Sequence, residues 1–308
     1  MTNQTDKGTL LVAVDVDGTL VNTENEGEIG GHAIAALEAV RRAGHVVALC
    51  TGRNLASVSS LLERSAWFPA DLPLILLNGA LVWGGDPRRE LACHLLDGPV
   101  VQQLVALFKR LDTVPMVYGM DGAGGILRHE ARPLNSALGR YLDLRRTRVG
   151  RLETVDDLMA LPWSQALEVG TIDTRSRIEA LTAAIGAELG GSVRVINTQS
   201  LLGGGAYFWA EVFQRDSGKG AGLATLAGAL GIPLARCIAI GDNYNDLDMF
   251  AVSGISVAMG NSPDDVKAAA DHLADDVTRG GAAVVLEAIA AGAFPATAGA
   301  AQREECGP

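Results

Sequence analysis

Residues 9–14 form an almost unbroken aliphatic run that ends abruptly at Asp15. Such a run of strand length is typical of a strand buried on both faces, as in a parallel sheet. Helical and strand-like segments then alternate along the chain. The expected elements are a helix over 31–43, a strand over 45–50, a helix over 55–64 and a strand over 74–77. This alternation predicts a doubly wound, Rossmann-like α/β sheet.

The same alternation returns in the C-terminal part of the chain. Helices are expected over 219–230, 246–252 and 263–270, and strands over 237–240 and 255–259. The tail beyond about residue 291 is rich in Ala and Gly and ends in charged residues, which predicts disorder. The two parts are therefore expected to share one sheet domain, although a long insert separates them.

The insert, residues 81–213, differs from the two flanking parts in its pattern of expected helices and strands. Helices are expected over 100–111 and 175–189, and strands over 116–118, 125–128, 166–170, 193–197 and 207–212. A segment of this size exceeds any ordinary surface loop, so we expect a separate α/β domain. The predicted division is a discontinuous core domain, residues 1–81 and 214–308, and an inserted domain, residues 82–213.

Composition narrows the functional class. The 308-residue chain has a formal net charge of -11 and no basic run that offsets it, which argues against binding to DNA or RNA. Residues 1–7 lack the apolar stretch of a signal peptide, and the apolar runs elsewhere are shorter than a membrane span. The four cysteines form no CxxC pair, which favours buried thiols. We expect a cytoplasmic protein without a membrane partner; the sequence leaves its oligomeric state open.

Four polar segments each follow an expected strand. They are residues 15–19 (DVDGT), 51–53 (TGR), 78–79 (NG) and 241–246 (GDNYND). The carboxyl ends of parallel strands open on one edge of an α/β sheet, which is where ligands bind in such folds. The fold class therefore predicts that these segments converge, although they lie far apart in the sequence.

The converging side chains suit phosphoryl transfer with a bound metal. Asp15, Asp17 and Asp242 offer the hard oxygen ligands that Mg²⁺ prefers. Thr51 offers a hydroxyl and backbone N–H groups to phosphate oxygens. Lys219 offers a positive charge near the N-terminus of an expected helix, where anions are favoured. A metal and a lysine together can neutralise the charge on a transferring phosphoryl group.

In their order along the chain, DxDGT, TGR, an isolated lysine and GDxxND resemble the four motifs of the haloacid dehalogenase (HAD) superfamily. The chain specifically resembles the Cof-type phosphatases, which carry a large α/β cap of the C2 (C2B) type. Asn78-Gly79-Ala80 and residues 257–261 (VAMGN) add to the likeness. The insert falls between Asn78 and Lys219, the position of a C2 cap, so the resemblance implies the HAD fold with an inserted α/β cap domain.

The resemblance implies a role for each motif residue. Asp15 is expected to be the nucleophile that forms an aspartyl-phosphate, and Asp17 the acid that protonates the leaving alcohol and then activates water. Mg²⁺ is expected on the Asp15 side chain, the Asp17 backbone carbonyl and the Asp242 carboxylate. Asp246 is expected to orient this metal shell from a second layer. The residues expected to bind the substrate phosphate, of which Thr51 and Lys219 also take part in catalysis, are Asp15, Thr51, Gly52, Lys219 and Asn245.

The functional hypothesis is a magnesium-dependent phosphatase of small phosphorylated metabolites, with sugar phosphates as the first expectation. A cap would enclose the active site and favour small substrates over phosphoproteins. One alternative is a phosphomannomutase-like phosphosugar mutase, which shares DxDGT but needs a bisphosphate activator. Another is a catalytically idle regulator that binds sugar phosphates, against which the intact motif residues argue. Dehalogenase chemistry is disfavoured because a departing halide, unlike an alkoxide, needs no proton from Asp17.

Three further patterns have simpler interpretations. Asp15, Asp17 and Glu26 fall at positions one, three and twelve of a calcium loop, but position six is Leu20 and a strand is expected before the segment. Gly203-Gly204-Gly205 lacks the Lys-Ser/Thr of a phosphate loop and favours a turn. The insert also carries arginines that could meet an anionic substrate, although a solvated face is the favoured interpretation. These arginines are Arg140, Arg145, Arg146 and Arg148.

Overall fold

The computed structural model describes residues 8–22, 27–85, 89–121, 124–148, 151–200, 202 and 204–294. The predicted tail disorder concerns mainly residues 295–308, which lie outside these ranges, as do residues 1–7, Glu26 and Gly203. The described residues divide into two compact units. The core unit comprises the residues up to Gly52, Leu61–Ala92 and those from Gly218 onward, and the inserted unit comprises Arg53–Ser60 and Cys93–Ser217.

The core unit is built on an eight-stranded sheet in the order β14-β13-β12-β1-β2-β3-β4-β5. Its strands from β14 to β3 are parallel, and β4 pairs antiparallel with β3. The strands are β1 Leu11–Asp15, β2 Val46–Cys50, β3 Leu74–Leu76, β4 Leu81–Trp83, β5 Glu90–Cys93, β12 Cys237–Gly241, β13 Ile255–Ala258 and β14 His272–Leu273. This sheet confirms the predicted doubly wound α/β class.

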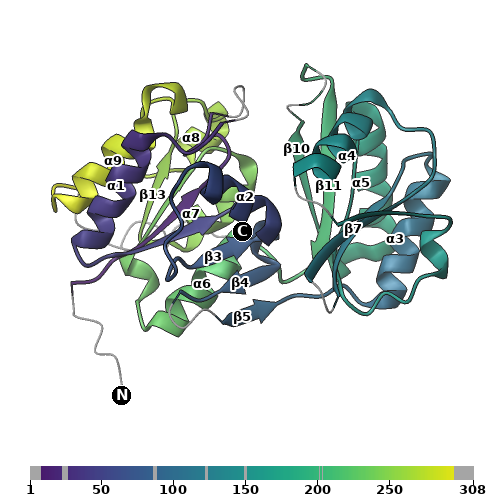
Figure 1. Cartoon of the computed structure of the whole chain (residues 1–308), viewed down its shortest axis with the longest axis horizontal. Coiled ribbons are helices and arrows are strands. Elements are labelled where there is room, and N and C mark those ends of the chain that lie inside the picture. The colour runs from purple at the N-terminus through teal and green to yellow at the C-terminus, as the bar shows by residue number, and fades with distance from the viewer. Residues whose placement is uncertain are drawn as a thin grey trace, which may run out of the picture. The chain divides into compact units, whose positions relative to one another are not determined.

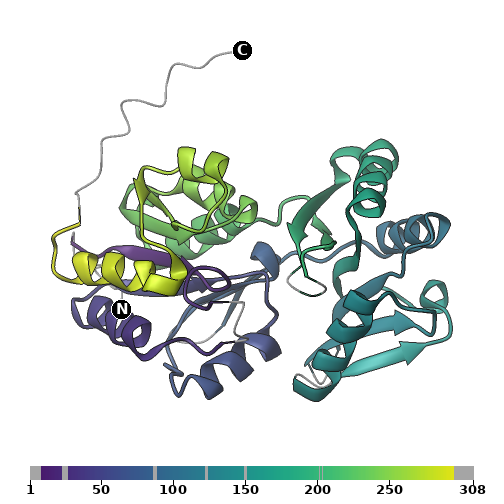
Figure 2. The same ribbon diagram turned by 90° about the horizontal axis from the view of Figure 1, so that it is seen from above.

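Helices cover both faces of the core sheet because its central strands are apolar on both sides. Leu11 packs on one face with Leu223 and Phe250 from α6 and α7. Val12, the next residue along β1, is also fully buried, and α1 and α9 lie side by side on that other face (Figures 1 and 2). The helices before and after the insert are α1 Gly31–Arg42, α2 Leu55–Arg64, α6 Lys219–Leu230, α7 Leu247–Val252, α8 Asp264–Ala268 and α9 Gly281–Ala290.

The inserted unit holds a six-stranded sheet in the order β10-β11-β9-β6-β7-β8. One face of this sheet packs against α3 and α5, with Val117, Val169 and Val212 of the strands in a cluster with Phe108 and Leu181 of the helices. The elements are α3 Gly98–Arg110, β6 Met116–Asp121, β7 Gly124–Glu130, α4 Ser136–Arg148, β8 Leu152–Val155, β9 Ala166–Thr174, α5 Arg175–Leu189, β10 Val193–Gln199 and β11 Tyr207–Gln214. This unit is α/β, as predicted for the insert.

Most predicted elements are confirmed, and α2, α5 and α6 begin and end at the predicted residues. The sequence missed α4 and α9 and the short strands β4, β5, β8 and β14. Since β4 and β5 join the core sheet, the first boundary of the insert lies between Ala92 and Cys93. The second boundary lies between Ser217 and Gly218. The sequence-based division stands at 81/82 and 213/214. Within the described ranges, no helix is long and apolar enough to cross a bilayer.

Substitution of Gly79 tests how tightly the turn after β3 packs against the start of α6. Its φ is +89°, and a Cβ at this position would overlap the backbone carbonyl of Gly218. Gly44 is a matched control, since its φ is +86° but nothing lies within 4 Å of its Cβ position. We expect Gly79→Ala to lower the free energy of unfolding by about 2–4 kcal/mol and Gly44→Ala by about 1 kcal/mol, measured by denaturant titration. Equal losses would show that the close approach is no constraint.

Candidate active site

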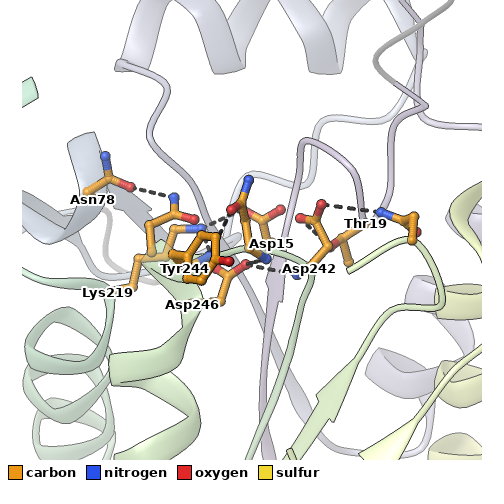
Figure 3. A network of polar contacts seen from close by, with 10 residues as sticks. Asp15, Thr19, Asn78, Lys219, Asp242, Tyr244 and Asp246 are labelled. Atoms are coloured by element: carbon orange, nitrogen blue, oxygen red, sulfur yellow. Dashed lines mark hydrogen bonds and ion pairs between the residues drawn. The ribbon is translucent and has the colours of Figure 1, made fainter. Parts of the chain in front are cut away.

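The centre of the site is a buried lysine between two carboxylates (Figure 3). Lys219 begins α6, and its Nζ donates to Asp15 Oδ1 at 2.6 Å and to Asp246 Oδ1 at 2.5 Å. Each of the three side chains is at most 6% exposed. Burial alone would lower the pKa of Lys219, but the two carboxylates hold this pKa well above its usual value, so the amine stays charged. The trio therefore ties together β1, α6 and the turn after β12.

The turn after β12 holds Asp246 through its own backbone. Asp246 Oδ2 accepts from the backbone N–H groups of Asp242 at 2.9 Å and Asn243 at 3.0 Å. Asn243 caps the start of this segment, because its Oδ1 accepts a hydrogen bond from the backbone N–H of Tyr244. Since Lys219 occupies the other carboxylate oxygen, both oxygens of Asp246 already have donors. This arrangement suits the predicted role of Asp246 as a residue that positions its neighbours.

The Asp242 carboxylate lies against the DVDGT segment. Its Oδ1 faces Thr19 Oγ1 at 3.5 Å, and its Oδ2 accepts from Asn261 Nδ2 at 3.2 Å. Asn261 Nδ2 also donates to the Gly18 carbonyl at 2.9 Å, and a Cβ at residue 18 would overlap the Asp242 carboxylate. The sequence assigned no role to Thr19 or Asn261. Their membership in two motif segments was the only signal that could have pointed to them.

Three carboxylates could hold a metal ion here. Asp15, Asp242 and Asp246 each offer an oxygen, and these atoms lie within 4.8 Å of one another. Burial raises the pKa of Asp15 to about 7, although Lys219 lowers it. Burial and the nearby Asp15 raise the pKa of Asp242 to about 9. Burial and neighbouring carboxylates thus disfavour the ionised forms, and a divalent cation bound here would offset that cost.

A second group of polar residues lies beside Asp246. Its members are Thr51, Gly52, Asn78 and Asn245. The Thr51 N–H donates to the carbonyl of Ile75 at 2.8 Å, and the Asn78 N–H donates to the carbonyl of Thr51 at 3.1 Å. Asn245 Nδ2 donates to Asn78 Oδ1 at 3.0 Å (Figure 3). Asn78 Nδ2 is buried and has no hydrogen-bond partner in the described part of the chain. Since buried amides are normally paired, Asn78 is a candidate donor to a ligand, a role that the sequence reading missed.

The structure thus joins Asp15, Lys219, Asp242 and Asp246 in one polar network, with Asn245 next to Asp246. Asp17 lies in the turn directly after β1, where the Gly18 N–H donates to the Val21 carbonyl at 2.9 Å. The turn carries Asp17 past the buried strand, and its side chain is partly exposed.

A family model described as haloacid dehalogenase-like hydrolase matches residues 12–286. The chain belongs to the haloacid dehalogenase-like hydrolases. The match spans most of the chain and contains every residue of the network around Lys219. The predicted family is therefore confirmed.

Known HAD proteins resemble this chain over most of their lengths. It is 26% identical over 301 residues to 5-amino-6-(5-phospho-D-ribitylamino)uracil phosphatase YwtE of Bacillus subtilis (strain 168), covering 92% of this chain and 99% of the relative. It is 26% identical over 280 residues to pyridoxal phosphate phosphatase YbhA of Escherichia coli (strain K12), covering 88% and 94%. The solved structure of the HAD subclass IIB sugar phosphatase BT4131 matches with a TM-score of 0.71 at 22% identity, covering 90% and 98%. These comparisons confirm the predicted fold and enzyme class, a hydrolase of phosphate esters.

The raised pKa of Asp242 makes a prediction for the metal-free protein. The folded-state pKa of about 9 lies above the ordinary value of 3.8, so the stability that the protonated form confers is lost as pH rises between these values. Asp242→Asn mimics the protonated group. In EDTA we expect this variant to exceed the wild type in free energy of unfolding by about 1–3 kcal/mol at pH 8–9, and the difference to vanish near pH 4. Denaturation across this pH range measures it, and a constant difference would contradict the assignment.

Proposed function

We propose that this HAD chain is a Mg²⁺-dependent phosphatase that hydrolyses small phosphorylated metabolites through an aspartyl-phosphate on Asp15. The supporting observation is the setting of Asp15, at the end of the buried strand β1 with its Oδ1 bonded to the charged Lys219. Asp242 offers a second carboxylate close by. A carboxylate that is held by a lysine beside a potential metal ligand is positioned to attack phosphorus, because nearby positive charge offsets that of the incoming phosphate.

Asp15 and Asp17 divide the chemistry between them in this proposal. A carboxylate oxygen of Asp15 bonds to phosphorus while the bond from phosphorus to the ester oxygen breaks, and Asp17 gives its proton to that leaving oxygen. Asp17 then takes a proton from the water that attacks phosphorus, which releases inorganic phosphate and restores Asp15. The buried Asp15 and the partly exposed Asp17 fit these different tasks.

The donor set fits a magnesium ion. Hard carboxylate oxygens from Asp15 and Asp242, with the Asp17 backbone carbonyl, are the kind of ligand that Mg²⁺ takes together with water and phosphate. Asp246 has both oxygens engaged by N–H donors, so we assign it to orienting the Asp242 segment. When bound, the metal would supply positive charge that stabilises the transferring phosphoryl group.

The substrate phosphate would be held by groups beside Asp15. Lys219 contributes charge, Thr51 would contribute its hydroxyl and Gly52 its backbone N–H, both just after β2. Asn245, which donates to Asn78, would hold the amide of Asn78 toward this region. The relatives named for pyridoxal phosphate and for a ribitylaminouracil phosphate support small phosphorylated metabolites as the substrate class. The likeness to the sugar phosphatase BT4131 supports sugar phosphates among them.

The nucleophile is tested by Asp15→Asn. With Mg²⁺ and p-nitrophenyl phosphate, we expect this variant to lose about 10³-fold or more in kcat because the amide cannot attack phosphorus. Asp264→Asn is the control, since this carboxylate is fully exposed on α8, and it should keep wild-type activity. Circular dichroism and Tm establish that both variants fold. Activity within tenfold of wild type in folded Asp15→Asn would refute the proposed mechanism.

The metal is tested by its removal. Dialysis against EDTA is expected to abolish hydrolysis of p-nitrophenyl phosphate, and millimolar Mg²⁺ to restore it. Mg²⁺ should also raise the Tm of the metal-free protein, because an ion that binds only the folded state stabilises it by mass action. Asp242→Asn should weaken this Tm response, whereas Asp264→Asn should leave it intact. Full activity after exhaustive chelation would contradict a metal requirement.

A further inference from the structure

The sheet of the inserted unit has a second face that differs from the one packed on α3 and α5. Side chains alternate between the two faces of a strand, so Tyr118 of β6 projects opposite Val117, and Trp209 of β11 opposite Ala210. Tyr118 pairs in register with Glu168 of β9. This second face therefore carries aromatic and acidic side chains, and α4 contributes to it. We call Tyr118, Tyr141, Arg145, Glu168 and Trp209 the Arg145 cluster.

Aromatic contacts hold α4 against this face. The rings of Tyr141 and Trp209 meet edge to face, with their centroids 4.8 Å apart. The Arg145 guanidinium carbon lies 5.9 Å from the ring centroids of both Tyr118 and Tyr141. These cation–π contacts position the guanidinium, but they give its buried Nε no hydrogen-bond acceptor.

Arg145 is buried without an acceptor. It is 7% exposed, its Nε is buried and unpaired, and it forms no hydrogen bond or ion pair with any residue that the structure describes. Arg146, next along α4, is 59% exposed and pairs with Asp143. The solvated interpretation of these arginines is thus right for Arg146 and wrong for Arg145. A buried N–H without an acceptor is costly to the fold, so the Nε of Arg145 points to an acceptor supplied from outside the chain.

Glu168 is the acidic side chain of the cluster and is partly exposed. The described residues give its carboxylate no hydrogen bond or ion pair, and Arg145 is the charged residue that acts on it. Burial raises the pKa of Glu168 to about 7, although Arg145 lowers it. Gly170 lets the Glu168 carboxylate pack closely against the strand, since a Cβ there would lie 2.9 Å from Glu168 Oε1. Gly125 does the same for Tyr118, whose hydroxyl a Cβ would overlap.

We propose that the Arg145 cluster binds a small organic anion that also carries hydroxyl or amino groups. Arg145 pairs with the anionic group, a carboxylate or a phosphate, and Glu168 accepts a hydrogen bond from a hydroxyl or amino group. Tyr118, Tyr141 and Trp209 line the site with rings that can pack against the carbon skeleton. The site is built from residues of the inserted unit alone and does not depend on the proposed phosphatase activity.

Binding is tested on the full chain by NMR of the Trp indole N–H signals, with the Trp209 signal assigned through Trp209→Phe. The probes are D-gluconate, D-glucose 6-phosphate and, as a neutral control, D-glucose. We expect both anions to shift the Trp209 signal, and Arg145→Met and Glu168→Gln each to raise their Kd about tenfold or more. Arg146→Met is the matched control and should bind as the wild type does. Absence of a shift with both anions, or an equal Kd in Arg145→Met, would overturn the proposal.

Stability separates a ligand site from a structural arginine. If Arg145 serves a ligand, Arg145→Met removes an unpaired buried charge, and its Tm in ligand-free buffer should equal or exceed that of the wild type. If Arg145 only stabilises α4 through the tyrosines, this variant should lose several degrees of Tm relative to Arg146→Met. Such a loss would overturn the proposal even if binding were also weakened.

Kinetics then separates two sources of the ligand. If the ligand is part of the substrate, Arg145→Met raises KM for D-glucose 6-phosphate more than KM for p-nitrophenyl phosphate. If it is a separate regulator, D-gluconate changes the rate with p-nitrophenyl phosphate without competing with it. The NMR measurement is repeated with Asp15→Asn, because binding to the Arg145 cluster does not require turnover of the probe. If the anions bind to Asp15→Asn but the wild type shows no phosphatase activity, the phosphatase proposal is rejected and the proposal of an anion site at the Arg145 cluster stands.

Discussion

Lys219 forms two ion pairs in a place that solvent scarcely reaches, and the rest of the site is arranged around them. Its Nζ meets Asp15 from the end of β1 and Asp246 from the turn after β12, so three distant parts of the chain share one charge centre. Removing one partner of such a buried pair costs about 3–5 kcal/mol, because the other charge is left uncompensated. With Asp242 added and all groups ionised, the cluster carries two net negative charges, which is the charge of a site built to receive a divalent cation.

Backbone geometry sets the distances that this charge centre needs. Gly18 lets the Asp242 carboxylate approach the DVDGT segment, where any Cβ would overlap it. After β3, Leu77 and Asn78 adopt φ values of +51° and +50°, which side chains of L-residues rarely adopt. This unfavourable turn places the Asn78 amide against Asn245. Strain of this kind persists where the surrounding structure enforces it, and such positions cluster at functional sites.

The sequence predicted the core sheet and the charge centre well, because both depend on strong local signals. Buried parallel strands read as continuous aliphatic runs, and parallel order forces their carboxyl ends together, which brought Asp15 and Asp242 to one edge. The contacts of Asn78 and Asn261 were not predictable, since an asparagine in a turn looks the same whether it caps a helix or orients a carboxylate.

The inserted unit was harder to predict for a physical reason. The α4 segment interrupts its apolar positions with Arg140, Arg145 and Arg146, so its helical period is weak. Arg145 lies over the ring of Tyr118, which is on a strand distant in the sequence. In the core unit, the missed strands β4 and β5 are only three and four residues long and are defined by their pairing in the core sheet. Strands this short leave little trace in local periodicity.

The most direct test of the account is to trap the covalent intermediate. Protein carrying Asp17→Asn, in which activation of the attacking water should be impaired, is mixed with substrate and Mg²⁺ and quenched. It is then reduced with borohydride and digested for peptide mass spectrometry. The account predicts that the peptide containing residue 15 gains the mass change of an aspartate converted to homoserine, which only an acyl phosphate at Asp15 gives. An unmodified Asp15, or the same change on a different carboxylate, would contradict it.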